Sequence, residues 1–199
     1  LADVVRRTKA ASAWIVPTMV LWETLIRYAD LNTLAALPEL KYTPPQQVEQ
    51  WKTAHQNRIK QPNFDRKKVE LIATNRMRIL KSLHEGGVRI LLGTDAPQQF
   101  SVPGFSIHRE MAFMVKCGFT PYQVIQSGTK NVGDYFKGKD DFGTVEVGKR
   151  ADLILVQGDP LKDVANIAKS AGVMARGRWM PESDIRVKLD EIAASLRVR

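Results

Sequence analysis

Two residues, Asp95 and His108, have the types and the positions that could support acid–base chemistry. Asp95 follows the apolar run 88–92, and a carboxylate at the end of a buried strand lies where α/β folds carry their chemistry. His108 comes near the start of the next expected helix, where the helix dipole disfavours the imidazolium. In an α/β repeat, the strand ends at the face where the following helix begins. Both side chains could therefore face one cleft.

Both residues also have a purely structural interpretation. Asp95 could cap its own loop by accepting backbone N–H bonds. His108 could be a surface histidine or a second cap. Four other titratable residues are expected to be structural or solvent-facing rather than catalytic: Glu23, His55, His84 and Glu110.

The spacing of residues in the sequence predicts neither a metal centre nor a Ser/His/Asp catalytic triad. A catalytic zinc site needs about three protein ligands and an open position. The chain has no His-x-His and no His-Glu-x-x-His, and no serine lies on a nucleophile elbow. Cys117 is the single cysteine, which excludes an internal disulfide and a cysteine zinc cluster within this chain.

Helices and strands are expected to alternate before Asp95. Residues 2–11 predict a helix that leads into a short β-branched strand over 13–19, and a helical stretch follows over 21–36. Asp65 is a plausible N-cap for a longer helix that ends at Gly86, directly before the strand of Asp95. This order favours a parallel α/β architecture.

The loop after Asp95 leads into two expected helices. Ser106 could cap the first of them, and Thr120 begins a capping box with proline at the first helical position of the second. Residues 42–63 predict a helical insertion over one face, which is a candidate lid or subunit contact.

The sequence pattern changes from Phe142 onward, where short strand-like runs with glycine turns replace the long helices. We predict three segments: the α/β part over 1–136 with its insertion 42–63, a small β layer over 137–180, and a terminal amphipathic helix over 181–199. Three strand-like runs are expected in the β layer: 143–148, 151–156 and 173–180, the last interrupted at Gly177.

Composition narrows the class of partner. Apolar residues make up 44% of the 199 residues, so the chain can bury a sizeable core. The net charge of +9 invites a nucleic-acid interpretation, but the basic residues are scattered, without a basic stripe, so we expect no nucleic-acid partner. We also expect no membrane span, since no apolar run approaches 18 residues. The chain begins at Leu1 on a helix-like stretch, as the middle of a larger product would, so localisation stays unassigned.

An ordered set of motifs resembles the C-terminal part of the metal-dependent amidohydrolase superfamily, nearest to its imidazolonepropionase-like and Xaa-Pro dipeptidase-like branch. Each motif is weak alone, but their order is specific and covers about residues 13–179, with no counterpart for 42–63. The motifs are Trp14-Ile-Val-Pro-Thr18, Ile90-Leu-Leu-Gly-Thr-Asp95-Ala, His108-Arg-Glu-Met, Gly118-Phe-Thr-Pro121, Gly128-Thr-Lys-Asn131, Gly143-Thr-Val-Glu-Val-Gly-Lys-Arg-Ala-Asp152-Leu and Gly158-Asp-Pro-Leu161.

The resemblance implies the last two strands and helices of a (β/α)8 TIM-like barrel, plus strands of a small β-sandwich. It implies that Asp95 is a metal ligand that also accepts the proton of the attacking water, and that His108 contacts substrate. The implied cofactor is one or two divalent ions, most commonly zinc. The remaining ligands would lie outside this chain, in an upstream part of the same protein or in a partner chain.

Two functions stay open. The first is a hydrolase of amide or related C–N bonds that acts on a small molecule or a short peptide, with homo-oligomerisation undecided. The second is a non-catalytic remnant or interaction module without a complete metal site.

Overall fold

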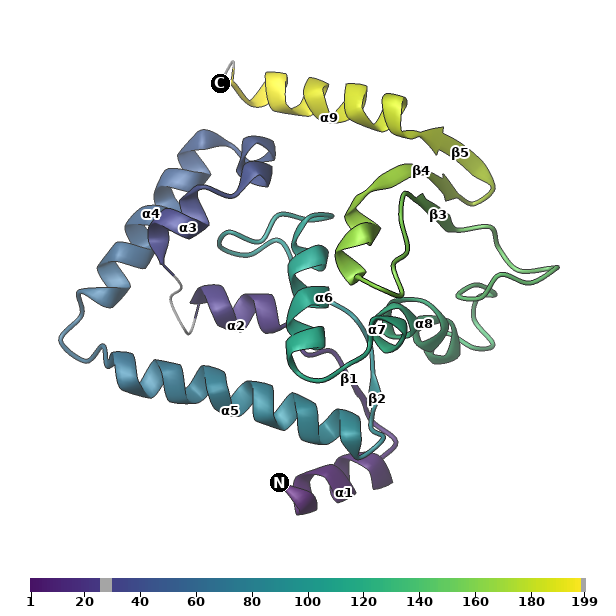
Figure 1. Ribbon diagram of the computed structural model, residues 1–199. Helices are drawn as coiled ribbons and strands as arrows, with labels where there is room; N and C mark the ends of the chain where they lie inside the picture. Colours follow the sequence, from purple (N-terminus) through teal and green to yellow (C-terminus); the bar gives the residue numbers. More distant parts are fainter. Residues whose placement is uncertain (26–29, 198–199) are drawn as a thin grey trace.

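The computed structural model describes residues 1–25 and 30–197, and it has a mixed α/β architecture. In Figure 1, helix α6 (Ser106–Lys116) lies at the centre, between helices from the first half of the chain and strands from its last third. No helix in the described part of the chain is both long and apolar enough to cross a membrane.

Two short parallel strands underlie the candidate site. The strands β1 (Trp14–Ile15) and β2 (Arg89–Ile90) pair in parallel, and each follows a helix, α1 (Ala2–Ala10) or α5 (Arg66–Glu85). The predicted helix-strand order is therefore confirmed. Both strands are shorter than the apolar runs that predicted them. In the part of the chain that the structure describes, each has a single neighbouring strand, so ladder hydrogen bonds form along one edge only.

A first hydrophobic core packs around this strand pair. Helices α2 (Met19–Leu25) and α7 (Pro121–Gly128) contribute to it together with α5 and α6, and α8 (Lys130–Tyr135) follows α7 directly. Its buried members are Met19, Leu80, Leu83, Val88, Ile90, Met111, Met114, Cys117, Phe119, Val124 and Val164.

Two helix starts follow the local signals in the sequence. The Asp65 carboxylate accepts hydrogen bonds from the backbone N–H groups of Lys67 and Lys68, which confirms it as the N-cap of α5. Thr120 and Gln123 form the complete capping box at the start of α7. Both signals depend on neighbours within three residues, which is why sequence alone could find them.

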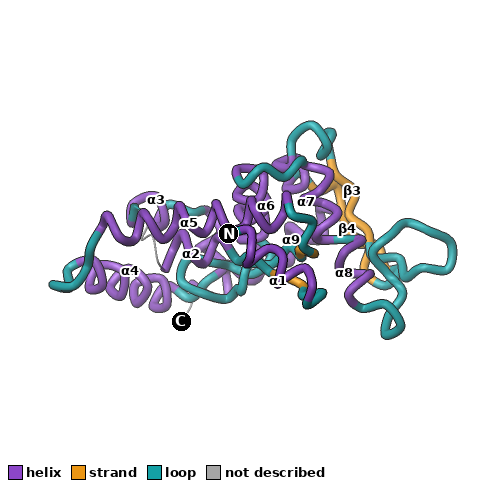
Figure 2. The backbone as a smooth tube through the Cα atoms, turned by 90° about the horizontal axis from the view of Figure 1, so that it is seen from below, coloured by secondary structure: helices purple, strands orange, loops and turns teal. Residues whose placement is uncertain are grey.

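The predicted insertion 42–63 forms α4 (Pro45–Ile59), which packs with α3 (Leu31–Ala35) and the 3-10 helix η1 (Pro38–Tyr42) into one unit. From here on we call this whole unit the insertion, and it shares a second core with the loop after Asp95. Residues 26–29 of the predicted helix 21–36 lie outside the described residues. Figure 2 shows from below that α3, α4 and α5 lie at one end of the molecule. The second core buries Leu34, Leu40, Phe100 and Val102, with Leu31, Leu37, Tyr42, Val48, Trp51 and Phe105 packed against them.

The C-terminal part forms a three-stranded antiparallel sheet. Its order is β3-β4-β5, from β3 (Leu153–Val156), β4 (Ser170–Ala175) and β5 (Arg178–Pro181), with the 3-10 helix η2 (Val164–Ala168) between β3 and β4. The turn from β4 to β5 passes through Gly177 with φ +78°, a left-handed conformation that glycine adopts without strain. The predicted interruption at this glycine is therefore a hairpin turn.

The strand predicted over 143–148 is wrong. This segment forms turns, and its Val145 and Val147 side chains are exposed. Alternating apolar residues need a partner strand to make a sheet, and none of the described residues pairs with this segment. The terminal helix α9 (Glu182–Arg197) contacts β4, β5 and η1, so it joins the sheet to the insertion along one edge of the molecule (Figure 1).

Candidate active site

Asp95 lies in the loop after β2, with its carboxylate exposed to solvent. Two bonds from the α7–α8 region hold the chain before it: Leu92 N–H donates to the Ser127 carbonyl over 3.1 Å, and Asn131 Nδ2 donates to the Ile90 carbonyl over 2.9 Å. The backbone of Asp95 is left-handed, with φ +57°. A fixed strand end therefore presents an exposed acid.

A buried hydroxyl pair connects this strand end to α6. Ser106 Oγ donates to Thr94 Oγ1 over 3.1 Å, and both side chains are buried. The prediction that Ser106 caps α6 is wrong, because Phe105 holds the N-cap position and no side chain caps the helix there. The Ser106 hydroxyl instead bonds the side chain of Thr94, and this bond fixes the first turn of α6 beside Thr94, the residue that precedes Asp95.

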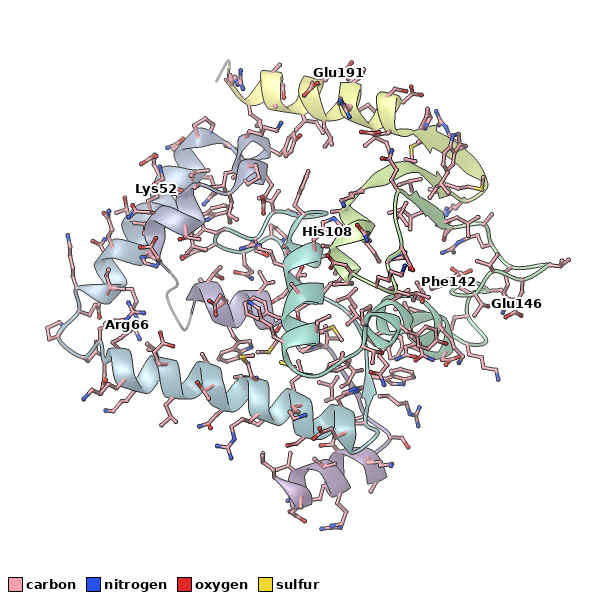
Figure 3. The ribbon with its side chains drawn as sticks, in the orientation of Figure 1. Lys52, Arg66, His108, Phe142, Glu146 and Glu191 are labelled. Atoms are coloured by element: carbon pink, nitrogen blue, oxygen red, sulfur yellow. The ribbon has the colours of Figure 1, made fainter. Side chains whose placement is uncertain are left out.

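His108 lies in that first turn and is half-buried. Figure 3 labels it in the upper part of α6, between the insertion and the sheet β3–β5. Its Nδ1 atom is buried and finds no hydrogen-bond partner in the part of the chain that the structure describes. Burial lowers the pKa of His108, and the nearby Glu39 carboxylate opposes this only in part. The ring is therefore neutral near pH 7.

Glu110 is a buried ionisable group whose position the sequence analysis did not predict. We expected it at the surface, but it is completely buried. Its two carboxylate oxygens accept hydrogen bonds from the backbone N–H groups of Met19 and Val20, each over 2.8 Å. Burial raises the pKa of Glu110 to about 7, against the opposing effect of these two bonds. The carboxylate thereby fastens α6 to the segment that follows β1.

Arg109, the preceding residue of α6, contacts the insertion and the loop after Asp95. Its guanidinium donates to the Phe100 carbonyl and lies 3.8 Å from the buried Glu39 carboxylate, between Arg109 Nε and Glu39 Oε1. Burial lowers the pKa of Arg109 while Glu39 partly restores it. The loop after Asp95 is thus held from α6 and from η1 together.

The remaining histidines are partly or wholly buried. His55 was expected on a solvated face of α4, but only 2% of it is exposed, because α4 packs against the rest of the insertion. The His84 ring stacks on Phe119 with 3.7 Å between centroids, and burial lowers the pKa of His84. The stacking is consistent with a structural role for His84, and its lowered pKa means that the cation expected at that helix end is disfavoured.

A groove of about 600 Å³ opens between α4 and the loop that follows Asp95. We call it the α4 groove. Pro97, two residues beyond Asp95 in the sequence, lines it, whereas Asp95 and His108 themselves do not. Its lining residues are Tyr42, Thr43, Pro44, Gln47, Gln50, Trp51, Ala54, Pro97, Gln98, Gln99, Ser101, Val102 and Pro103.

Within residues 1–25 and 30–197, no group of three or more His, Cys, Asp or Glu side chains is placed to hold a metal ion. Asp95 is an oxygen donor and His108 a nitrogen donor, and both types suit zinc. Asp95 can therefore supply one ligand of a larger set, and the prediction that His108 faces the same cleft stays a prediction.

Residues 1–180 match the model of the Amidohydrolase family. The chain belongs to this family. Among curated proteins, none matches the sequence.

Solved structures share the fold. A bottromycin amidohydrolase superposes with a TM-score of 0.71 at 22% identity, over 98% of this chain and 43% of its own. A Xaa-Pro dipeptidase with bound methionine gives 0.51 at 24% identity, over 78% of this chain and 38% of its own. A prolidase complexed with N-methylphosphonate-L-proline gives 0.59 at 17% identity, over 90% and 37%. The chain thus spans less than half the length of these amidohydrolase structures.

Proposed function

We propose that this chain supplies the C-terminal part of a metal-dependent hydrolase of amide or related C–N bonds. The observation that carries the proposal is the exposed Asp95 carboxylate in the loop after β2, whose neighbour Thr94 is bonded to α6, in a chain that belongs to the amidohydrolase family. The similarity to a Xaa-Pro dipeptidase and a prolidase favours a short peptide or a related small molecule as substrate.

In this proposal, β1 and β2 are the last two strands of a barrel, and residues outside this chain complete it. The parallel pairing of β1 with β2 and the helix before each strand agree with that assignment. The sheet β3–β5 would be the returning part of a composite β-sandwich over 137–180. The position of β3 at the edge of this sheet supports this, because an edge strand can pair with a further strand and its apolar side chains are exposed: Leu153, Ile154 and Leu155.

The Asp95 carboxylate is a suitable ligand for a divalent metal, but one ligand is too few to hold the ion. It is one exposed oxygen ligand, and the described residues offer no cluster of three. Asp95 would therefore be this chain's contribution to a shared site, with zinc as the preferred ion. When bound, such an ion would lower the pKa of a water and polarise the scissile carbonyl.

The chain's own residues would then move the proton and place the substrate. Asp95 accepts a proton from the attacking water and passes it to the leaving amine as the C–N bond breaks. His108, neutral through burial and with an unpartnered Nδ1, hydrogen-bonds a polar group of the substrate. Thr94 and Ser106 keep both segments in register through their hydroxyl pair.

The decisive experiment compares Asp95→Asn with the unchanged sequence in the complete polypeptide, including residues upstream of Leu1. We expect hydrolysis of a dipeptide panel to fall by about 10³-fold or more, since the proton acceptor and a ligand are lost together. Bound metal, measured by elemental analysis, should also fall. Asp190→Asn, an exposed acid on α9, is the matched control and should change neither quantity.

The second candidate function is an interaction module without catalysis. The exposed apolar side chains of β3 are the observation that favours it. A complete polypeptide that carries no divalent metal, and whose hydrolysis is unchanged in Asp95→Asn, would establish this alternative and refute the enzyme.

A further inference from the structure

The α4 groove has two fixed walls. Trp51 from α4 lies against Phe100, with ring centroids 5.6 Å apart, and Tyr42 stacks on Phe105 at 4.9 Å. Arg109 holds the Phe100 carbonyl, as described above. Because the second core joins the insertion to the loop after Asp95, the groove is part of the folded structure.

The lining of the α4 groove is uncharged. Its described lining residues include no Asp, Glu, Lys, Arg or His. A charged group of a ligand would therefore lose water without gaining a counter-ion, which is unfavourable. A neutral ligand is the one that this surface suits.

The polar groups of the groove match an amide. Four glutamine side chains line it, and each presents both a carbonyl acceptor and an NH₂ donor. A peptide bond likewise offers one donor and one acceptor. Tyr42, Trp51 and the prolines add flat apolar surface between these polar groups. The glutamines are Gln47, Gln50, Gln98 and Gln99.

Ser101 provides an independent observation at the same place. It lines the groove, it is completely buried, and its Oγ has no hydrogen-bond partner among residues 1–25 and 30–197. Its backbone is already committed, because Ser101 N–H donates to the Gln98 carbonyl over 2.9 Å. A buried hydroxyl without a partner is unfavourable, and because this Oγ is enclosed, a ligand gains that difference only when a small shift of the loop brings it within hydrogen-bond distance.

We propose that the α4 groove is a subsite for a neutral, amide-bearing segment of the substrate, beyond the bond that Asp95 acts on. The enzyme would then prefer blocked or internal peptide segments to free dipeptides with charged ends. This inference rests on the proposed function for the identity of the reacting bond, and on the groove alone for the chemistry of the segment.

The test is binding to the ¹⁵N-labelled complete polypeptide, the same protein in which Asp95→Asn is compared. The probe is the blocked dipeptide N-acetyl-Phe-Pro-amide, and the comparison is Phe-Pro with free charged ends. We expect saturable shifts of the glutamine side-chain amides and of the Trp51 indole with the blocked probe. Binding of the charged form should be at least about tenfold weaker, because its ends lack counter-ions.

Three variants sharpen the assignment. Gln50→Glu places a charge in the groove and should weaken binding of the blocked probe by about fivefold or more. Gln56→Glu makes the same change on an exposed part of α4 outside the groove and should leave binding unchanged. Ser101→Ala should weaken binding by about threefold if the hydroxyl pairs with the probe, with the spectrum of the free variant confirming its fold.

Two results would overturn the inference: equal affinity for the two probes, or shifts that avoid the groove and survive Gln50→Glu. Since the assay requires neither metal nor turnover, its failure is separate from failure of the proposed function. Groove binding in a protein that hydrolyses no amide refutes only the enzyme. Hydrolysis that is indifferent to charge at the substrate ends refutes only the subsite.

Discussion

Two hydrophobic cores meet at α6, and neighbouring residues of that helix anchor them by different means. Glu110 fastens the first core, because both of its oxygens accept backbone N–H bonds at the start of α2. Arg109 fastens the second core through the Phe100 carbonyl and the buried Glu39 carboxylate. One anchor is a carboxylate held by neutral donors, and the other is a charge pair.

This difference suggests that one core sets the position of Asp95 and that the other sets the shape of the α4 groove. The first core sets where β1 and β2 end, and therefore where Asp95 lies. The second core sets the walls of the α4 groove, and therefore, under our proposal, which substrate segment the groove accepts. A change in one core should leave the other largely intact, because distant substitutions without shared partners act additively.

The largest effects on the free energy of unfolding are expected from replacing a large buried side chain in each core by alanine. Met114 and Phe100 are both completely buried, one in each core. We expect Met114→Ala and Phe100→Ala each to lower the free energy of unfolding by about 3 to 5 kcal/mol, through lost burial and a residual cavity. Urea denaturation gives the total. Hydrogen exchange locates the loss at the Leu91 amide for Met114→Ala and along α4 for Phe100→Ala. Equal acceleration at both places in both variants would mean that the cores form one cooperative unit.

An intermediate effect is expected from the pH dependence of the first anchor. The pKa of Glu110 is about 7 in the folded chain, above its ordinary value of 4.5. The folded state therefore binds more protons between these values, and stability should fall as pH rises from about 4.5 to about 7, by roughly 2 to 3 kcal/mol. The measurement is the unfolding free energy across this range for the unchanged chain and for Glu110→Gln.

The Glu110→Gln variant should lack this decline. Glu191→Gln, an exposed substitution on α9, is the matched control and should retain it. A decline of the same size in Glu110→Gln would assign the titration to another group and remove the contrast between the two anchors.

The smallest effect is expected from the second anchor. Arg109→Lys keeps a charge near Glu39 but cannot reproduce the planar fork, so the bond to the Phe100 carbonyl should be lost for about 1 kcal/mol. Lys81→Met breaks the exposed pair with Glu85 and should change stability by less than about 0.5 kcal/mol. Thermal unfolding of both variants measures the difference. An Arg109 effect no larger than that of Lys81 would show that aromatic packing alone holds the groove wall.

Sequence predicted the features that depend on near neighbours. The caps at Asp65 and Thr120 depend only on residues within three positions of each helix start. The order of helix and strand follows from the alternation of apolar patterns. The resemblance to amidohydrolases was likewise visible in the order of short motifs, and the match over residues 1–180 confirms it.

Sequence did not predict features that depend on contacts between distant segments. Glu110 looks like any helix carboxylate until residues 90 positions earlier supply its donors. His55 is buried by the packing of a helix whose own composition is polar. The segment 143–148 has the alternation of a strand, but it lacks a partner among the described residues. The roles of Asp95 and His108 stay predictions that the proposed experiments decide.

The turns after β1 and β2 have one feature in common. Thr18 and Asp95 both adopt left-handed backbone, with φ +49° and +57°, where glycine would be strain-free. For a β-branched residue such as Thr18, this conformation is a genuine outlier. If stability alone were optimised, glycine would be the natural choice at both turns, so each side chain is retained at a local energetic disadvantage. Attempts to stabilise the protein by replacing strained residues should therefore leave these two positions unchanged.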